Sequence, residues 1–218
     1  MSPAARLFWY DLLSWGHVKK TTDHEIFSDK LEAWLKSSQP KTLAALTEVF
    51  KEKSLALIFL ILMAIPALPI PTGGITHAFE IIVMGLAPFF MFGKNRVPHR
   101  WQDRDLPSVL RQKTLPFLLR RIRWIERYSR PRGNWFIENR LSSMVTGMVV
   151  FALTLTAFLA PPFSGLDTLP ALGVVLISLA VILDDALLLL SGFIIGGLGI
   201  VVVIGLGKII IDFIHQLI

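Results

Sequence analysis

Residues 55–93 read LALIFLILMAIPALPIPTGGITHAFEIIVMGLAPFFMFG, which is two apolar runs on either side of a segment rich in proline and glycine. The first run, Leu55 to Ile70, has sixteen residues and the second, Ile75 to Gly93, has nineteen. A helix needs about 20 apolar residues to cross a bilayer. Proline lacks a backbone N–H and glycine permits tight turns, so Pro69, Pro71 and Gly74 predict a break between two helices. The stretch therefore predicts a helical hairpin of roughly membrane dimensions.

The whole chain has the composition of a membrane protein. Of its 218 residues, 53% are hydrophobic and 17% are charged, whereas soluble domains carry about 25% charged residues. Three more apolar segments follow the hairpin, namely Leu141 to Leu166, Thr168 to Leu183 and Ala186 to Gly207. We predict an all-α, polytopic integral membrane protein with about five apolar segments. The absence of cysteine excludes disulfides and thiolate metal sites.

Two of these segments resemble each other. Residues 67–87 (ALPIPTGGITHAFEIIVMGLA) align without gaps with residues 160–180 (APPFSGLDTLPALGVVLISLA), and five positions are identical. Each copy has an apolar run, a proline-rich break and a second apolar run. The sequence therefore predicts two Pro-interrupted hairpin repeats and a C-terminal helix. The hairpins either cross the membrane fully or are re-entrant.

The charges predict the orientation. Residues 94–143 hold thirteen Lys/Arg against four acidic residues, and the two breaks contain no Lys or Arg. The positive-inside rule then places residues 1–53 and 94–143, with the N-terminus, in the cytoplasm. We divide the chain into N-terminal cytoplasmic or interfacial helices (1–53), a first membrane hairpin (54–93), a basic amphipathic linker (94–143), and a second hairpin with the C-terminal helix (144–218).

The basic linker contains the sequence TLPFLLRRIRWIERY, residues 114–128, with apolar residues on one helical stripe. Arginines occupy the remaining surface. Such a helix either lies on an anionic lipid surface or packs on the bundle with its arginines in water.

The first break carries two ionisable residues, His77 and Glu80, beside its breakers Pro69, Pro71 and Gly74. Pro162 occupies the corresponding place in the second break. The break is either a turn at the membrane surface or a pair of broken helices that faces a substrate. An acidic residue within an apolar segment is a candidate functional residue. His77 and Glu80 either relay a proton or bind a cation, or they only reach headgroups.

A second set of candidates lies outside the breaks. Asp184 and Asp185 separate two apolar segments, and either pair with arginines of residues 94–143 or bind a ligand. Arg130, Arg132 and Arg140 form either a site for a lipid phosphate or an ordinary positive flank.

The sequence contains no catalytic or nucleotide-binding motif, and we predict no enzyme, metal or cofactor. The basic residues flank membrane segments, so we expect membrane lipids rather than nucleic acid as partners. Gly192 and Gly196 have GxxxG spacing, which indicates either a homodimer or helix packing within the chain.

The layout resembles that of the exopolysaccharide-synthesis ExoD family of bacterial membrane proteins. The similarity runs from about Ser28 to Gly207 and rests on KTLAALTEVFKEKSLALIFLILMAIPALPIPTGG (41–74), RRIRWIERYSRPR (120–132), the break at 160–165 and the acidic pair. The residues of this chain that match the family pattern are Pro69, Pro71, Arg130, Pro131, Arg132 and Asp185. The chain departs from the family at two places. The family commonly has a Trp-Leu-Pro-like segment after the second helix, where this chain has NRVPHRW (95–101) with Trp101 displaced. The family also often has glycine after the aspartate, where this chain has Ala186 after Asp185. The resemblance implies a multi-pass inner-membrane protein needed for exopolysaccharide production, linked in rhizobia to nodule invasion and alkali tolerance.

Three molecular functions fit these features. The leading hypothesis is that the protein supports exopolysaccharide synthesis or export by binding or translocating an anionic lipid-linked precursor, such as a polyprenyl-phosphate-linked sugar. The second is a small cation or proton pathway through His77 and Glu80. The third is a scaffold without transport activity that docks synthesis enzymes through residues 94–143.

Overall fold

The computed structural model describes residues 27–69, 74–92, 105–106, 110–129, 139–161 and 164–217. Its helices are α2 (Phe27–Lys36), α3 (Leu43–Phe50), the 3-10 turn η2 (Lys51–Lys53), α4 (Ser54–Met63), α5 (Ile75–Met91), the π-helical turn η3 (Leu110–Thr114), α7 (Leu115–Glu126), α9 (Arg140–Leu159), α10 (Thr168–Leu183) and α11 (Ala186–Leu217). Within these ranges the only β-type pairing is an isolated bridge between Thr42 and Asp105. The all-α prediction is confirmed.

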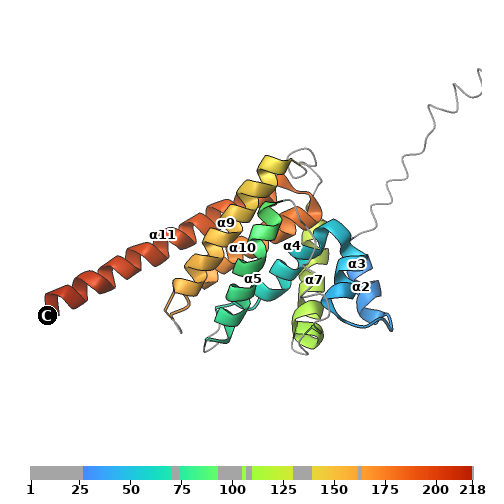
Figure 1. Ribbon diagram of the computed structural model, residues 1–218, viewed down its shortest axis with the longest axis horizontal. Coiled ribbons are helices and arrows are strands. Elements are labelled where there is room, and N and C mark those ends of the chain that lie inside the picture. The colour runs from blue at the N-terminus through green and yellow to red at the C-terminus, as the bar shows by residue number, and fades with distance from the viewer. Residues whose placement is uncertain are drawn as a thin grey trace, which may run out of the picture.

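The helix α4 forms the centre of the bundle. All ten of its residues are buried, and it packs against α5, α10 and α3. The helices α4 and α5 form one hairpin, and α9 and α10 form the other. The first helix of each hairpin packs on the second helix of the other, since α4 packs on α10 and α9 packs on α5 (Figure 1). The long helix α11 packs mainly on α10, and its C-terminal part projects beyond the bundle.

The first break starts earlier than the sequence predicted. The helix α4 ends at Met63, and turns follow up to Leu68, so the helical part of the predicted segment Leu55 to Ile70 is short. Pro66 explains the position of the end, since proline disfavours the helical conformation of the residue before it and has no N–H to donate. A ten-residue helix is only about 15 Å long, about half of a hydrocarbon core.

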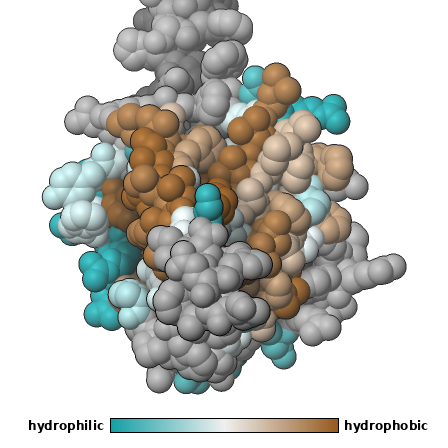
Figure 2. Space-filling model, turned by 90° about the vertical axis from the view of Figure 1, so that its left-hand side faces the viewer, coloured by the Kyte–Doolittle hydropathy of each residue, from teal (hydrophilic) through white to brown (hydrophobic). Residues whose placement is uncertain are grey.

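Two helices have the length and composition needed to cross a membrane, namely Arg140–Leu159 and the Ala186–Lys208 part of α11. Shorter apolar helices cover Thr76–Met91 and Thr168–Leu183. Large apolar side chains are exposed along the two long helices at Leu141, Met144, Val145, Met148, Leu159, Leu187, Leu190, Ile194, Leu198, Val201, Val202, Ile204 and Leu206. Figure 2 shows hydrophobic residues over much of the described surface on the side toward which α11 projects.

Glycines set the contact between α10 and α11. A Cβ atom added at Gly173 would lie 2.5 Å from the Cα of Gly196, and one added at Gly192 would lie 2.9 Å from the backbone nitrogen of Ile177. A Cβ atom added at Gly196 would lie 2.5 Å from Cδ1 of the Leu153 side chain on α9. The GxxxG pair therefore serves helix packing within the chain, which was one of its two interpretations.

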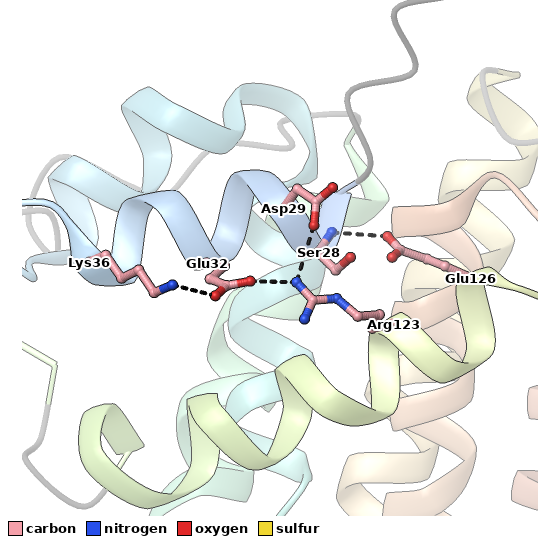
Figure 3. Close-up of polar contacts among 6 residues, drawn as sticks. All are labelled: Ser28, Asp29, Glu32, Lys36, Arg123 and Glu126. Atoms are coloured by element: carbon pink, nitrogen blue, oxygen red, sulfur yellow. Dashed lines mark hydrogen bonds and ion pairs between the residues drawn. The ribbon is translucent and has the colours of Figure 1, made fainter.

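An ionic network joins the N-terminal helices to α7 (Figure 3). The Arg123 guanidinium lies 3.1 Å from Asp29 and 2.5 Å from Glu32 of α2, and Lys36 lies 2.6 Å from Glu32. The backbone N–H of Ser28 also donates to Glu126 Oε1 at 3.0 Å. Leu115, Leu118 and Ile122 form the buried stripe of α7. These contacts fix one face of α7 against the rest of the fold.

We predict that acid weakens this network in a defined pH range. Lys36 first, and then Arg123, lower the pKa of Glu32 to about 2 from its ordinary value of 4.5. Because the folded-state pKa is depressed, the stabilisation is complete above about pH 4.5 and is lost as the pH falls through about 2. The protection factors of α2 amides, which correct for the intrinsic pH dependence of exchange, should fall over that range, and Glu32→Gln should remove most of this fall. Equal pH dependence in the wild type and in Glu32→Gln would contradict the prediction.

Candidate functional site

The strongest candidate site lies at the first break. His77 Nδ1 is 2.7 Å from Glu80 Oε2, and the Glu80 side chain is 0% exposed, while His77 is partly exposed. A buried carboxylate in contact with a partly exposed imidazole is a geometry that allows a proton to move between solvent and the interior.

The local sequence produces this contact directly. Gly74 has a φ of 86°, a left-handed conformation that glycine adopts without strain, and it precedes the first turn of α5. The N–H of His77 donates to the carbonyl of Gly74 at 3.2 Å and closes that turn. His77 and Glu80 are three residues apart, so they share one face of α5. Pro69, at the other side of the break, is exposed.

The second break contributes residues to the same site. The His77 ring contacts the ring of Phe158 near the end of α9 edge-on, with centroids 5.4 Å apart. Asp167, the residue before α10, interacts electrostatically with both His77 and Glu80. The start of α5 therefore lies close to the end of α9 and to the residue before α10. Asp167 is not among the site residues predicted from the sequence, although its place in the second break, opposite Gly74 in the alignment, was a usable signal.

Two oxygens of this region are buried without a partner among the described residues, namely Glu80 Oε1 and Thr168 Oγ1. Buried polar atoms are normally satisfied, and orphaned ones are concentrated where water, an ion or a proton completes the site. Within the described part of the chain, no group of three acidic or histidine side chains could hold a metal ion. The contact between a buried carboxylate and an imidazole is an arrangement suited to proton transfer.

The acidic pair lies at the other end of the bundle. Lys53 Nζ donates to Asp184 Oδ2 at 2.6 Å and to the carbonyl of Ile182 at 2.7 Å. Asp185 is buried, accepts a hydrogen bond from Ser129 Oγ at 2.8 Å, and caps α11 by accepting from the N–H of Leu187 at 2.9 Å. Lys53 and Ser129 are partners that the sequence did not single out.

The predicted site residues therefore fall into two groups. His77, Glu80, Pro69 and Gly74 lie at the breaks, whereas Asp184, Asp185 and the exposed Arg140 lie at the opposite end. Arg140 and Phe158 are eighteen residues apart on α9, which corresponds to about 27 Å. A small ligand at one end cannot contact the other group. Pro71, Pro162, Arg130 and Arg132 lie outside the described residues.

These features define a helical protein with two helices of membrane-spanning length and a buried ionisable pair where two helix breaks meet. The chain belongs to the exopolysaccharide synthesis ExoD family, whose model matches residues 27–205. It is also similar to the uncharacterized protein slr1875 of Synechocystis sp., with 26% identity over 154 residues, which are 70% of this chain and 72% of that protein. No solved structure matches it.

Proposed function

We propose that this protein supports exopolysaccharide synthesis from within the membrane through a proton-binding site at its two breaks. Membership of the ExoD family supports the connection with exopolysaccharide synthesis. The two long apolar helices support the membrane location. In this proposal the site is part of a pathway for protons. A role in that pathway would explain why an ionisable residue is buried in an apolar helix.

One observation carries the proposal, namely the 2.7 Å contact between His77 and the fully buried Glu80, whose second oxygen has no described partner. In the proposed step, partly exposed His77 takes a proton from water at one ring nitrogen. It then releases a proton from Nδ1 to Glu80 Oε2, so that imidazolium and carboxylate become imidazole and carboxylic acid. Asp167 contributes negative charge that favours the proton-loaded state.

Proton flux into proteoliposomes tests this function. With an imposed pH gradient and a pH-sensitive dye inside the vesicles, we expect the wild type to raise the flux above that of protein-free vesicles. Glu80→Gln should reduce the increment at least about tenfold, because an amide of the same shape can accept the His77 hydrogen bond but cannot ionise. Asp167→Asn should reduce it less.

The matched control is Glu48→Gln, which makes the same chemical change at an exposed position on α3. It should leave the flux unchanged. If the wild-type flux equals that of protein-free vesicles, the proposed pathway is wrong.

A second candidate function is the binding of an anionic lipid-linked precursor at the opposite end of the bundle. The supporting observation is that Arg140 is exposed at the start of α9, at the end of the bundle that also holds Lys53. In this version the precursor phosphate binds near Arg140, Arg130 and Arg132. Arg140→Ala should then weaken binding of a polyprenyl phosphate, and Glu80→Gln should not.

A further inference from the structure

The face of α7 that points away from the bundle has an unusual composition. Its exposed residues are Arg120, Arg121 and Trp124 of α7, and the face continues with the exposed Arg127 and Tyr128 of the turn that follows the helix. We call these five residues the outer face of α7. Trp124 is 58% exposed and Tyr128 is 72% exposed, and their rings contact each other with centroids 5.2 Å apart. Large exposed aromatic rings beside arginines are typical of residues at lipid headgroup depth.

The charge of this face is not neutralised within the described residues. Arg123, on the side of α7 toward α2, is paired with Asp29 and Glu32. No ion pair joins Arg120, Arg121 or Arg127 to another described residue, and the one acidic residue of α7, Glu126, accepts from Ser28. The outer face therefore presents three positive charges and no negative one.

The position of α7 relative to α11 indicates what this face meets. Ser129, just after α7, donates to Asp185, and Asp185 directly precedes α11. If α11 crosses the membrane from Ala186, its first residues lie at one membrane surface. The C-terminal end of α7, which carries the outer face, must then lie close to that same surface.

We propose that the outer face of α7 binds the headgroups of anionic phospholipids in the leaflet at which α11 begins. The three guanidinium groups bind lipid phosphates, and Trp124 and Tyr128 insert at headgroup depth. Each arginine near an anionic leaflet favours the bound state by roughly fivefold. The inference depends on the membrane location of α11 but not on proton transfer at Glu80.

Full-length protein in nanodiscs tests the proposal, with phosphatidylcholine as the neutral lipid and increasing fractions of phosphatidylglycerol. Because the chain has no cysteine, Pro116→Cys introduces a single labelling position on the same side of α7, one turn before Arg120. An environment-sensitive dye there should shift its emission to the blue as phosphatidylglycerol is added. Salt at about 1 M should reverse the shift, since it shortens the screening length to about 3 Å.

Combined Arg120→Gln, Arg121→Gln and Arg127→Gln should remove most of the blue shift at every phosphatidylglycerol fraction, whereas lysine at the same three positions should retain most of the response. Lys36→Gln, Lys51→Gln and Lys208→Gln together remove the same charge at exposed positions elsewhere and should have little effect. The proposal would be overturned if the emission did not change with added phosphatidylglycerol. It would also be overturned if the arginine and lysine triple glutamine variants lost the blue shift to the same extent. A shift caused by inorganic phosphate alone, without anionic lipid, would also overturn it. Proton flux of the same variants, measured in proteoliposomes, reports on the proposed pathway separately.

Discussion

Gly173→Leu is expected to have a midpoint of thermal unfolding in detergent at least about 6 °C below that of Gly197→Leu, which should not fall below the wild type. The two positions differ in what a side chain would meet. A Cβ atom at Gly173 would lie 2.5 Å from Gly196 Cα, 2.9 Å from Gly196 N and 3.1 Å from the carbonyl oxygen of Gly192. At Gly197 nothing lies within 4 Å of the corresponding point.

The contacts at Gly173 are with backbone, so no change of rotamer relieves them and α10 must move away from α11. Overpacking of this kind destabilises by about 3 kcal/mol or more, and 1 kcal/mol shifts the midpoint of a domain of this size by roughly 2–4 °C. Both substitutions gain the same helix propensity of about 1 kcal/mol, so the difference between them isolates packing. Equal midpoints for the two variants would mean that the close contact between α10 and α11 does not exist in the folded protein.

The sequence predicted the helical class and the two breaks because both depend on local chemistry. Apolar runs and proline positions act over a few residues, and the i, i+3 spacing alone indicated that His77 and Glu80 can meet. Three predicted segment ends differ from the helix ends: α4 ends at Met63 rather than near Ile70, α9 ends at Leu159 rather than Leu166, and α11 continues to Leu217 rather than Gly207. Pro66 ends α4 well before Pro69, and its effect on Ile65 was not considered.

Apolar composition could not distinguish burial in lipid from burial in protein. The helix α4 is as hydrophobic as a membrane span, yet every one of its residues is enclosed by other helices, and those of α10 are largely buried too. Most of the exposed large apolar residues among the described ones are on α9 and α11 instead. Which helix is central depends on how distant segments pack, and one sequence carries little information about that.

The same limit explains the missed partners. Glu80 and Asp167 are far apart in the chain, and only the packing of the two hairpins brings them together. One of the two interpretations of Asp184 paired it with arginines of residues 94–143, whereas the partner that the structure describes is Lys53. Asp184 also adopts a left-handed conformation with a φ of 54°, which aspartate tolerates better than most residues, so it makes the turn between α10 and α11 itself.

The pair of Lys53 and Asp184 leads to the second large effect. Lys53→Met should destabilise the protein by about 2 kcal/mol, between the 0–1 kcal/mol of exposed ion pairs and the 3–5 kcal/mol of breaking a fully buried one. The side chains are 36% and 21% exposed, so both are only partly shielded from water. Lys53 also satisfies the carbonyl of Ile182 at the end of α10, and its loss leaves that acceptor without this donor.

A double-mutant cycle separates the pair from these other effects. Asp184→Asn preserves the size of the side chain and its tolerance of the left-handed turn, and Lys53→Met preserves the aliphatic part of lysine. We expect a coupling energy of about 1–2 kcal/mol from the midpoints of the wild type, the two single variants and the double variant. Additive effects would show that the two charges do not interact.

Lys36 and Glu32 provide the matched comparison, because their charged atoms are also 2.6 Å apart but Lys36 is 76% exposed. Lys36→Met should therefore have a small effect, about 0.5 kcal/mol or less. The difference between the two lysines follows from position: Lys36 sits on the surface of α2, whereas Lys53 connects the start of α4 to the turn that leads into α11. Loss of Lys53 should consequently increase hydrogen exchange at the start of α11 as well as in α4, and loss of Lys36 should change neither.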